Sequence, residues 1–207
     1  MNIRNFTMEF GEKYPISVRH IRLKDRDFPL QQLHTREQKG WIFNLIRGRW
    51  ILPKTRLEKG IALVVCNMIY EPSYLSLEWA LRYYNVIPES VSWYTACTTK
   101  KTQTYHTELG SFVYRTIQPR YYRWYDLVNI GNYSHIRVAS PEKTICDYIY
   151  LHPEIIHKDD FEEQRINREV RKEIASDSIL CDYANKYPPR VQKIAKIFLD
   201  YIHEDDA

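Results

Sequence analysis

Arginine and lysine clusters are the residues of this chain whose types and spacing point to a chemistry, the binding of a polyanion. Residues 16–59 hold 11 Lys+Arg against 4 Asp+Glu, and residues 92–125 hold 5 against 1. Residues 150–207 hold 9 against 13, so the net charge of +4 conceals an uneven field. Such a field favours a polyanionic partner, most often nucleic acid, although charge alone leaves a solvated basic surface as the alternative.

The cations between residues 19 and 54 are the candidate DNA contacts, because phosphates are bound by flexible or forked cations at several points. The first choices are Arg36, Lys39, Arg47, Arg49 and Lys54. The next choices are Arg19, Arg22 and Lys24, and the candidates for contact with base edges are Gln32, Gln38 and Asn44.

A second group of cations is interleaved with aromatic residues. The cations are Lys100, Lys101, Arg115, Arg120 and Arg123, and the rings are Tyr105, Tyr121, Tyr122 and Trp124. Rings can stack on bases while cations bind the backbone, which predicts a second polyanion surface. The alternative is that the rings belong to the core or to an interface and the arginine stems cover them.

Patterns typical of enzymes are weak. "SPEK" at residues 140–143, with Asp126 upstream, faintly resembles the carboxylate-plus-lysine sets of metal-dependent nucleases. A helix start explains the same residues, with Ser140 as N-cap, Pro141 in the first turn and Glu142 near the positive helix end. GxSxG, Walker A and GxGxxG motifs are absent from the sequence, and its 7 histidines form no HxxxH pair with a Glu. We expect no catalytic residue, no metal and no cofactor, with a nuclease as the less favoured alternative.

The cysteines and the apolar runs bear on the compartment. No two of the 4 cysteines have CxxC spacing, and each lies in an apolar setting, so we expect reduced, structural thiols. The N-terminal residues lack the apolar run of a signal peptide, and no run of about 18 apolar residues is present. These features predict a cytoplasmic protein that does not enter a membrane.

The N-terminal cations need elements to position them. Residues 30–39 suit a helix that ends at Gly40, and residues 41–46 and 49–52 suit two strands around Arg47-Gly48. A helix followed by a basic hairpin is typical of the second half of a winged helix-turn-helix. Residues 3–14 and 16–26 should supply the first two helices, although residues 16–25 alternate like a strand. We predict a winged helix-turn-helix-like domain over residues 1–56.

The remaining residues, 57–207, predict an α+β domain with a small antiparallel sheet and C-terminal helices. Helices are expected over 57–70, over 77–85 with Ser76 as N-cap, and from 140 onward. Strands are expected over 92–98, 111–118 and 135–139, with a turn at 131–132 before the last of them. The C-terminal region should be helical from residue 160, with breaks near 175–178 and at Pro188-Pro189.

Three landmarks occur in order: "PSYLSLEWALRYYNVIPE" at 72–89, "TACTTKKTQTYHTELGSFVYRTIQP" at 95–119 and "RVASPEKTICDYIYL" at 137–151. Together they resemble the AbiEi family of antitoxins from type IV toxin–antitoxin (abortive infection) systems of phage defence. The resemblance covers about residues 30–200. It implies an N-terminal winged helix-turn-helix followed by an antitoxin domain, and it makes the second cation group a candidate antitoxin surface.

The function implied by the resemblance is a DNA-binding transcriptional repressor of its own operon. Such a protein also counteracts a nucleotidyltransferase-like toxin encoded beside it, without forming a stable complex. Double-stranded DNA of its own operator is therefore the expected partner, with two protomers on a palindromic site. The alternatives are a protein-interaction module of the same fold that does not bind DNA and, less favoured, the nuclease.

Overall fold

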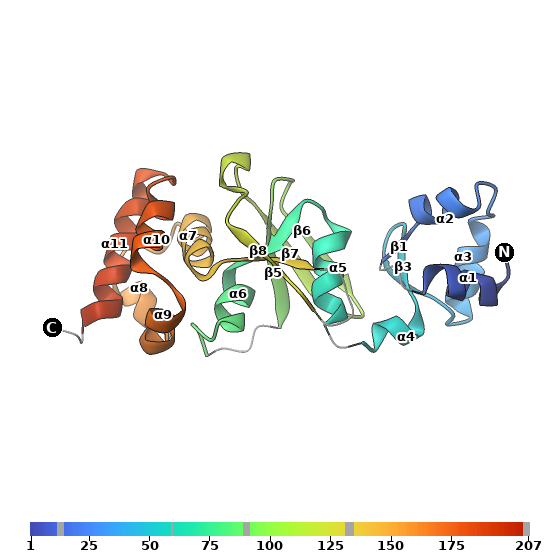
Figure 1. Cartoon of the computed structure of the whole chain (residues 1–207), viewed down its shortest axis with the longest axis horizontal. Helices are drawn as coiled ribbons and strands as arrows, with labels where there is room; N and C mark the ends of the chain where they lie inside the picture. Colours follow the sequence, from blue (N-terminus) through green and yellow to red (C-terminus); the bar gives the residue numbers. More distant parts are fainter. Residues whose placement is uncertain (12–14, 59, 89–91, 131–134, 205–207) are drawn as a thin grey trace.

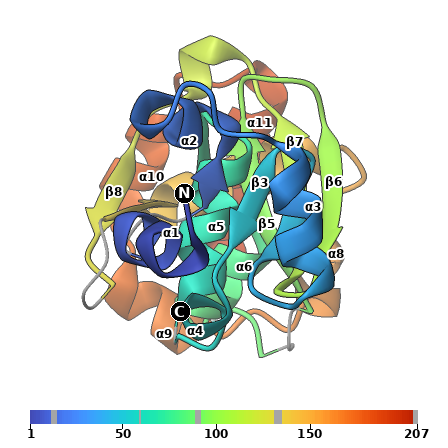
Figure 2. The same cartoon turned by 90° about the vertical axis from the view of Figure 1, so that its right-hand side faces the viewer.

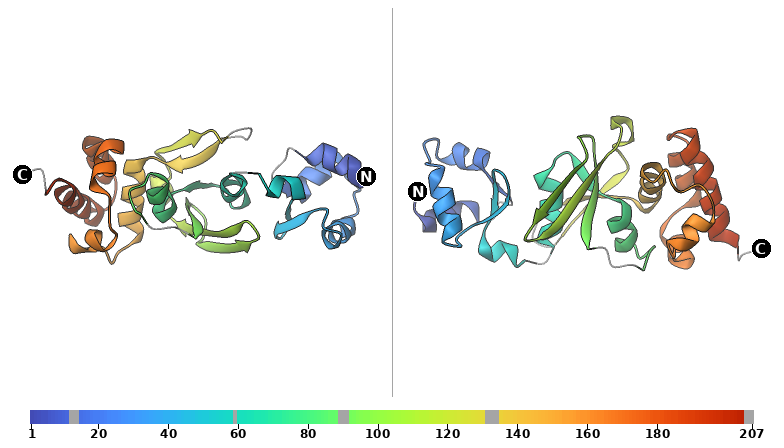
Figure 3. Two further views of the ribbon diagram at one scale, coloured as in Figure 1. Left: turned by 90° about the horizontal axis from the view of Figure 1, so that it is seen from below. Right: turned by 180° about the vertical axis from the view of Figure 1, so that it is seen from behind.

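The structure is a computed structural model that describes residues 1–11, 15–58, 60–88, 92–130 and 135–204. The molecule is elongated, with the N-terminal unit at one end, a sheet in the middle and a group of helices at the C-terminal end (Figure 1). The views from below and from behind show the same order of parts (Figure 3).

The N-terminal unit contains three helices and a small antiparallel sheet. Its elements are α1 (Ile3–Phe10), β1 (Ile16–Ser17), α2 (Val18–Lys24), α3 (Gln31–Gln38), β2 (Phe43–Ile46) and β3 (Arg49–Ile51), with strand order β1-β3-β2. The predicted helix over 30–39 is confirmed as α3, and Gly40 follows it with a φ of +68°. The two predicted strands around Arg47-Gly48 are also confirmed.

The first two predicted helices are present in shortened form. Residues 3–10 form α1, whereas residues 16–24 form a two-residue strand and then α2, so both expectations for this region hold in part. The part of the first prediction that falls on residues 12–14 lies outside the described residues. One hydrophobic cluster unites this unit, and it includes Phe6, Phe10, Ile21, Phe28 and Leu33.

A short connection leads into the second part of the chain. Helix α4 (Pro53–Arg56) ends at the predicted domain boundary, and α5 (Ile61–Ile69) begins after Gly60. Gly60 has a φ of +83°, a conformation that glycine adopts readily. Leu45 and Ile51 of the small sheet join the same hydrophobic cluster as Ile61, so the two units share packed apolar surface.

The central sheet has six strands in the order β6-β7-β5-β4-β9-β8. Their bounds are β4 (Ser73–Leu75), β5 (Trp93–Thr98), β6 (Gln103–Thr107), β7 (Gly110–Thr116), β8 (Tyr125–Val128) and β9 (Ile136–Ala139). The predicted strands over 92–98, 111–118 and 135–139 are confirmed, whereas the predicted turn at 131–132 lies outside the described residues.

The prediction of an antiparallel sheet in this domain is wrong, because the sheet is mixed. β5 and β7 are parallel, as are β4 and β9. The reason is that β6 and β7 form a hairpin whose second strand, rather than its first, pairs with β5. β6 therefore becomes an edge strand, and its polar sequence QTYHT hid it from hydrophobic pattern analysis.

Helices cover both faces of the central sheet. α5 packs on one face, where Ala96 and Tyr114 point, and α6 (Leu77–Tyr83) and α7 (Pro141–Leu151) pack on the other, where Cys97 points. The predicted start of α7 is confirmed: the hydroxyl of Ser140 accepts a hydrogen bond from the Lys143 backbone N at 3.2 Å.

The start of α6 corrects one prediction. Ser76 occupies the N-cap position, but its side chain does not cap the helix. Its hydroxyl instead donates to the carboxylate of Asp147 at 2.9 Å, and Thr95 Oγ1 from β5 accepts from the Trp79 backbone N at 3.0 Å. Leu77 and Leu81 of this helix are buried.

Four helices cover the outer side of α7. They are α8 (Asp159–Glu163), α9 (Arg168–Ile174), α10 (Asp177–Ala184) and α11 (Pro189–His203). The predicted breaks are confirmed, since α9 ends at residue 174 and α11 begins at Pro189. An additional break separates α8 from α9.

The cysteines are free, and Cys66, Cys97 and Cys146 are buried. Burial raises the pKa of the Cys66 thiol to about 12, which keeps it protonated at neutral pH. Within the described residues, no helix combines the length and the apolar character that a membrane span requires.

Candidate nucleic-acid interface

The turn between β2 and β3 presents two of the predicted DNA contacts. Arg47 is exposed and Arg49 is half-buried, and between them Gly48 has a φ of +78°. The Gly48 carbonyl accepts a hydrogen bond from the Val18 backbone N at 3.4 Å. This bond holds the turn beside the N-terminus of α2.

Helix α2 carries three more of the predicted contacts. Arg19, Arg22 and Lys24 are exposed. Lys24 Nζ lies 3.0 Å from the carboxylate of Glu9, and the Arg22 guanidinium donates to the carbonyl of Arg26. An exposed ion pair of this kind is weak and easily exchanged for a phosphate contact.

The other predicted contacts are more dispersed. Lys39 follows α3 and is exposed, with Nζ 4.8 Å from the centre of the Trp41 ring. Lys54 is exposed on α4, in the connection to the second part of the chain. The candidates for base contact, Gln32, Gln38 and Asn44, are also exposed.

The prediction that Arg36 contacts DNA is corrected by the structure, because only 4% of the residue is exposed. Its guanidinium lies over the rings of Phe6 and Phe28, at 4.3 and 5.0 Å from their centres. Nη2 donates to the Met1 carbonyl at 2.6 Å and to Gln32 Oε1 at 3.2 Å. Burial lowers the pKa of this guanidinium. Arg36 therefore ties α3 to α1 and is not available to a phosphate.

The second cation group is assembled by the central sheet. Lys100 and Lys101 follow β5, whereas Arg120 and Arg123 follow β7. Since β5 and β7 are parallel, their C-terminal ends lie at the same end of the sheet. All four side chains are exposed there. The structure thus brings together two pairs of cations that are about 20 residues apart in the sequence.

Arg115 does not belong to this exposed group. It lies within β7, is half-buried, and its Nη2 donates to the Leu151 carbonyl at the end of α7 at 3.2 Å. Arg115 is therefore less accessible than the other four cations: it pairs in register with Cys97, and strand alternation directs both side chains to the face that α6 and α7 cover.

The aromatic rings of the second group serve packing, which supports the alternative stated from the sequence. Tyr121 is 1% exposed and stacks on Tyr187, with ring centres 4.3 Å apart. Trp124 stacks on Tyr183 at 4.1 Å. Arg120 and Arg123 lie over these two rings, so the rings hold cations at the surface but are not free to stack on bases.

Helix α2 and the second cation group lie toward the same side of the molecule, whereas α4, which carries Lys54, lies on the opposite side (Figure 1). In Figure 1, α2, the connection between β5 and β6 and the 3-10 turn η1 (Pro119–Tyr121) all lie along the upper side. The view turned by 90° shows the same arrangement (Figure 2). One extended polyanion can therefore run along α2 and along the end of the central sheet.

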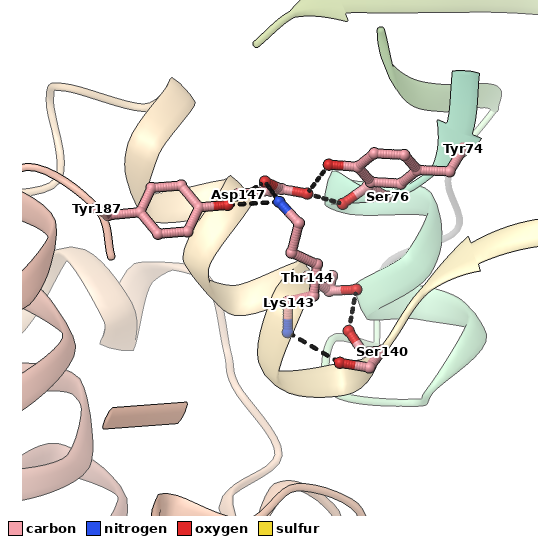
Figure 4. A network of polar contacts seen from close by, with 7 residues as sticks. All are labelled: Tyr74, Ser76, Ser140, Lys143, Thr144, Asp147 and Tyr187. Atoms are coloured by element: carbon pink, nitrogen blue, oxygen red, sulfur yellow. Dashed lines mark hydrogen bonds and ion pairs between the residues drawn. The ribbon is translucent and has the colours of Figure 1, made fainter. Parts of the chain in front are cut away.

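A buried polar cluster, which we name the Asp147 cluster, was not predicted from the sequence. Asp147 Oδ2 accepts from the hydroxyls of Tyr74 at 2.8 Å and Ser76 at 2.9 Å, and Oδ1 accepts from the Tyr187 hydroxyl at 2.8 Å (Figure 4). Lys143 forms an ion pair with the same carboxylate, and both side chains have 0% exposure. The cluster joins β4, α7 and the segment before α11. Its sequence signal is the Lys-Asp pair at i and i+4.

The residues considered for a nuclease, Lys143, Glu142 and Asp126, do not share one site in the structure. Lys143 is enclosed in the Asp147 cluster, and Glu142 is buried with Oε1 accepting from the Ser176 backbone N at 2.9 Å. Asp126 is exposed on β8. In the described part of the chain, no three His, Cys, Asp or Glu residues are grouped in a way that could hold a metal ion.

His152 pairs with Glu78. Its Nε2 lies 3.2 Å from Glu78 Oε1, and this contact joins the end of α7 to α6. Burial opposes charge on His152, but the hydrogen bond and the charge of Glu78 dominate and raise the pKa of the imidazole. Burial likewise disfavours the charged carboxylate, yet the bond from His152 lowers the pKa of Glu78.

Comparison with known protein families finds no family model that this chain matches. Comparison with curated proteins also finds no match.

Proposed function

We propose that this chain is a DNA-binding antitoxin that represses transcription of its own operon. The observation that carries the DNA-binding part is the element order of the N-terminal unit, helix–strand–helix–helix–strand–strand, with the exposed Arg47 and the half-buried Arg49 at the last turn. A winged helix-turn-helix has this order, with the third helix in the major groove and the hairpin on the phosphates.

The surface of α3 fits the role of the groove-reading helix. Gln31, Gln32, His34, Thr35 and Gln38 are exposed on it, and side chains of these types can hydrogen-bond to base edges. Arg47 and Arg49 at the turn, and Arg19 and Arg22 on α2, supply charge for phosphates on either side. Phosphate contacts would then set the position of the protein, while α3 supplies the sequence preference.

The exposed cations after β5 and β7 extend the same proposal. They lie toward the same side as α2, so a duplex that follows α2 can also approach the end of the central sheet (Figure 1). Two protomers on a palindromic operator would give such a complex twofold symmetry. The second cation group is also the candidate antitoxin surface.

The antitoxin part of the proposal rests on the resemblance to the AbiEi family. The functional partner is a nucleotidyltransferase-like toxin encoded beside this chain, which is counteracted without a stable complex. The proposed protein is cytoplasmic, acts in phage defence and uses no cofactor.

Two experiments test the two parts separately. A mobility-shift titration of the full chain on the DNA upstream of its own gene should give salt-dependent, sequence-specific binding. Equal affinity for that DNA and for an unrelated duplex of the same length would refute the repressor and leave an interaction module. Mg²⁺-dependent cleavage of the DNA in the same reaction would favour the nuclease.

The antitoxin part is tested by co-expression. The neighbouring open reading frame should encode a nucleotidyltransferase-like protein whose expression alone stops growth, and co-expression of this chain should restore growth. Failure to restore growth at matched expression levels would refute the antitoxin activity and leave the DNA-binding result untouched.

A further inference from the structure

A groove of about 1130 Å³ opens where the connection into α5 passes the central sheet. Its walls come from α4 and α5, from α6, from the β6–β7 turn and from the ends of β8 and β9. The two cation groups take no part in it. The groove therefore has no role in the proposed binding of DNA.

The walls of the groove are largely aromatic and aliphatic. Trp79 and Tyr83 of α6 stack on each other with ring centres 5.2 Å apart, and Tyr94 stacks on Phe112 at 5.3 Å. The aliphatic lining residues are Ile61, Leu63, Leu109, Val128, Ile130 and Ile136. Rigid rings beside aliphatic side chains are the surfaces that bind apolar anchors of a protein partner.

Two large apolar side chains on the segments that supply the groove walls remain exposed. Leu57, which stands between the lining residues Arg56 and Glu58, is 81% exposed. Tyr83 is 46% exposed although it also lines the groove. Neighbouring large apolar side chains that remain in water beside a cleft mark interaction surfaces. Burial of these two side chains would favour binding of a partner.

Among the described residues that line the groove, carboxylates outnumber cations. Arg56 forms an ion pair with Glu108 and lies over the ring of Phe43, 4.1 Å from its centre. Glu58 adds a second carboxylate to the lining, so two carboxylates face one guanidinium. This balance disfavours a phosphate or carboxylate ligand and favours one positive charge on the occupant.

We propose that the groove docks an extended segment of another protein that carries apolar side chains and one lysine or arginine. The apolar side chains would lie between the Trp79–Tyr83 pair and the aliphatic wall, and the cation would meet Glu58. A second copy of this chain and an uncharged small molecule are the competing occupants. The proposal does not depend on DNA binding or on the toxin.

Phage-displayed random peptides provide a direct test with the full-length chain as bait. Peptides selected against the chain should share apolar residues next to a lysine or arginine. A synthetic selected peptide should quench tryptophan fluorescence on binding. Trp79→Ala should weaken its binding about tenfold or more, the loss typical of a truncated aromatic anchor.

Charge variants keep the test valid if Trp79→Ala fails to fold. Glu58→Lys should weaken binding of the peptide. The control Glu163→Lys makes the same charge change at an exposed position of α8 and should leave peptide binding unchanged. Thermal unfolding and circular dichroism check that each variant is folded. Equal binding by Glu58→Lys and the wild type, or selection of peptides without a basic residue, would overturn the proposal. Concentration-dependent dimers that Glu58→Lys abolishes would overturn it in favour of a second copy.

Discussion

Neutralising the turn between β2 and β3 should change how DNA binding responds to salt. The variant is Arg47→Gln combined with Arg49→Gln. Arg47 is exposed, and Arg49 lies on the adjoining strand, half-buried. Glutamine keeps a polar side chain of similar reach and removes the charge. Neither arginine belongs to the hydrophobic cluster that unites the N-terminal unit, so folding should be preserved.

The magnitude follows from counterion release. Each phosphate contact contributes about 0.9 to the slope of log affinity against log salt, so loss of two contacts lowers the slope by about 1.8. Over a fourfold rise in salt, from about 50 to about 200 mM, this difference amounts to about twelvefold. The advantage of the wild type over the variant should therefore shrink about twelvefold across that range.

Fluorescence anisotropy on the upstream DNA at several salt concentrations measures both slopes. The matched control is Lys193→Gln with Lys196→Gln, which removes the same charge from exposed positions on α11 at the other end of the molecule. A control slope equal to the wild type shows that net charge is not responsible. Identical slopes for the wild type and the turn variant would refute the assignment of this turn to phosphate contact.

Three further predictions concern buried or paired groups. Lys143→Met should destabilise the chain by about 3–5 kcal/mol, because it leaves the Asp147 carboxylate buried without its counter-charge. The double variant Lys143→Met with Asp147→Leu should lose less stability than Lys143→Met alone. Urea unfolding measures the stability of both variants. His152→Gln should reduce stability most between about pH 4.5 and 6.5. The raised pKa of His152 stabilises the folded chain below the unfolded pKa of 6.5, and this stabilisation is lost as the pH rises through the folded pKa. The lowered pKa of Glu78 stabilises the folded chain above the unfolded pKa of 4.5, and this stabilisation is lost as the pH falls through the folded pKa. Urea midpoints measured across this pH range test the prediction. Arg36→Met should lower the thermal midpoint yet leave the salt slope of DNA binding unchanged, and a flatter slope would return Arg36 to the interface.

Local sequence rules were sufficient where an element is defined by its own residues. Gly40 and the Arg47-Gly48 turn bound α3 and the hairpin, and Ser140-Pro141 begins α7, all as predicted. The same rules missed β4, β6 and β8, which are short or polar. Such strands are stabilised by hydrogen bonds to neighbours that are distant in sequence, and a local pattern does not contain that information.

The candidate DNA contacts also divide into those that the sequence alone indicated and those that depend on tertiary packing. Exposure of Arg19, Arg22 and Arg47 follows from their polar positions in short elements, and the sequence alone placed them among the candidate contacts. Arg36 looked equivalent by type and position on its helix. Its burial depends on Phe6 and Phe28, which meet α3 only after the three helices pack.

The sequence by itself determined the segregation of charge, the N-terminal helix and hairpin, and the free cysteines, because each depends on residue type or on neighbours within a few positions. Only the tertiary structure decided that β7 lies parallel to β5, which brings Lys100 and Arg120 to one end of the sheet, and that α7 packs where Arg115 reaches the Leu151 carbonyl. It also decided that Lys143 is enclosed by Asp147. These outcomes depend on strand order and on burial, and both arise from contacts between residues far apart in the chain.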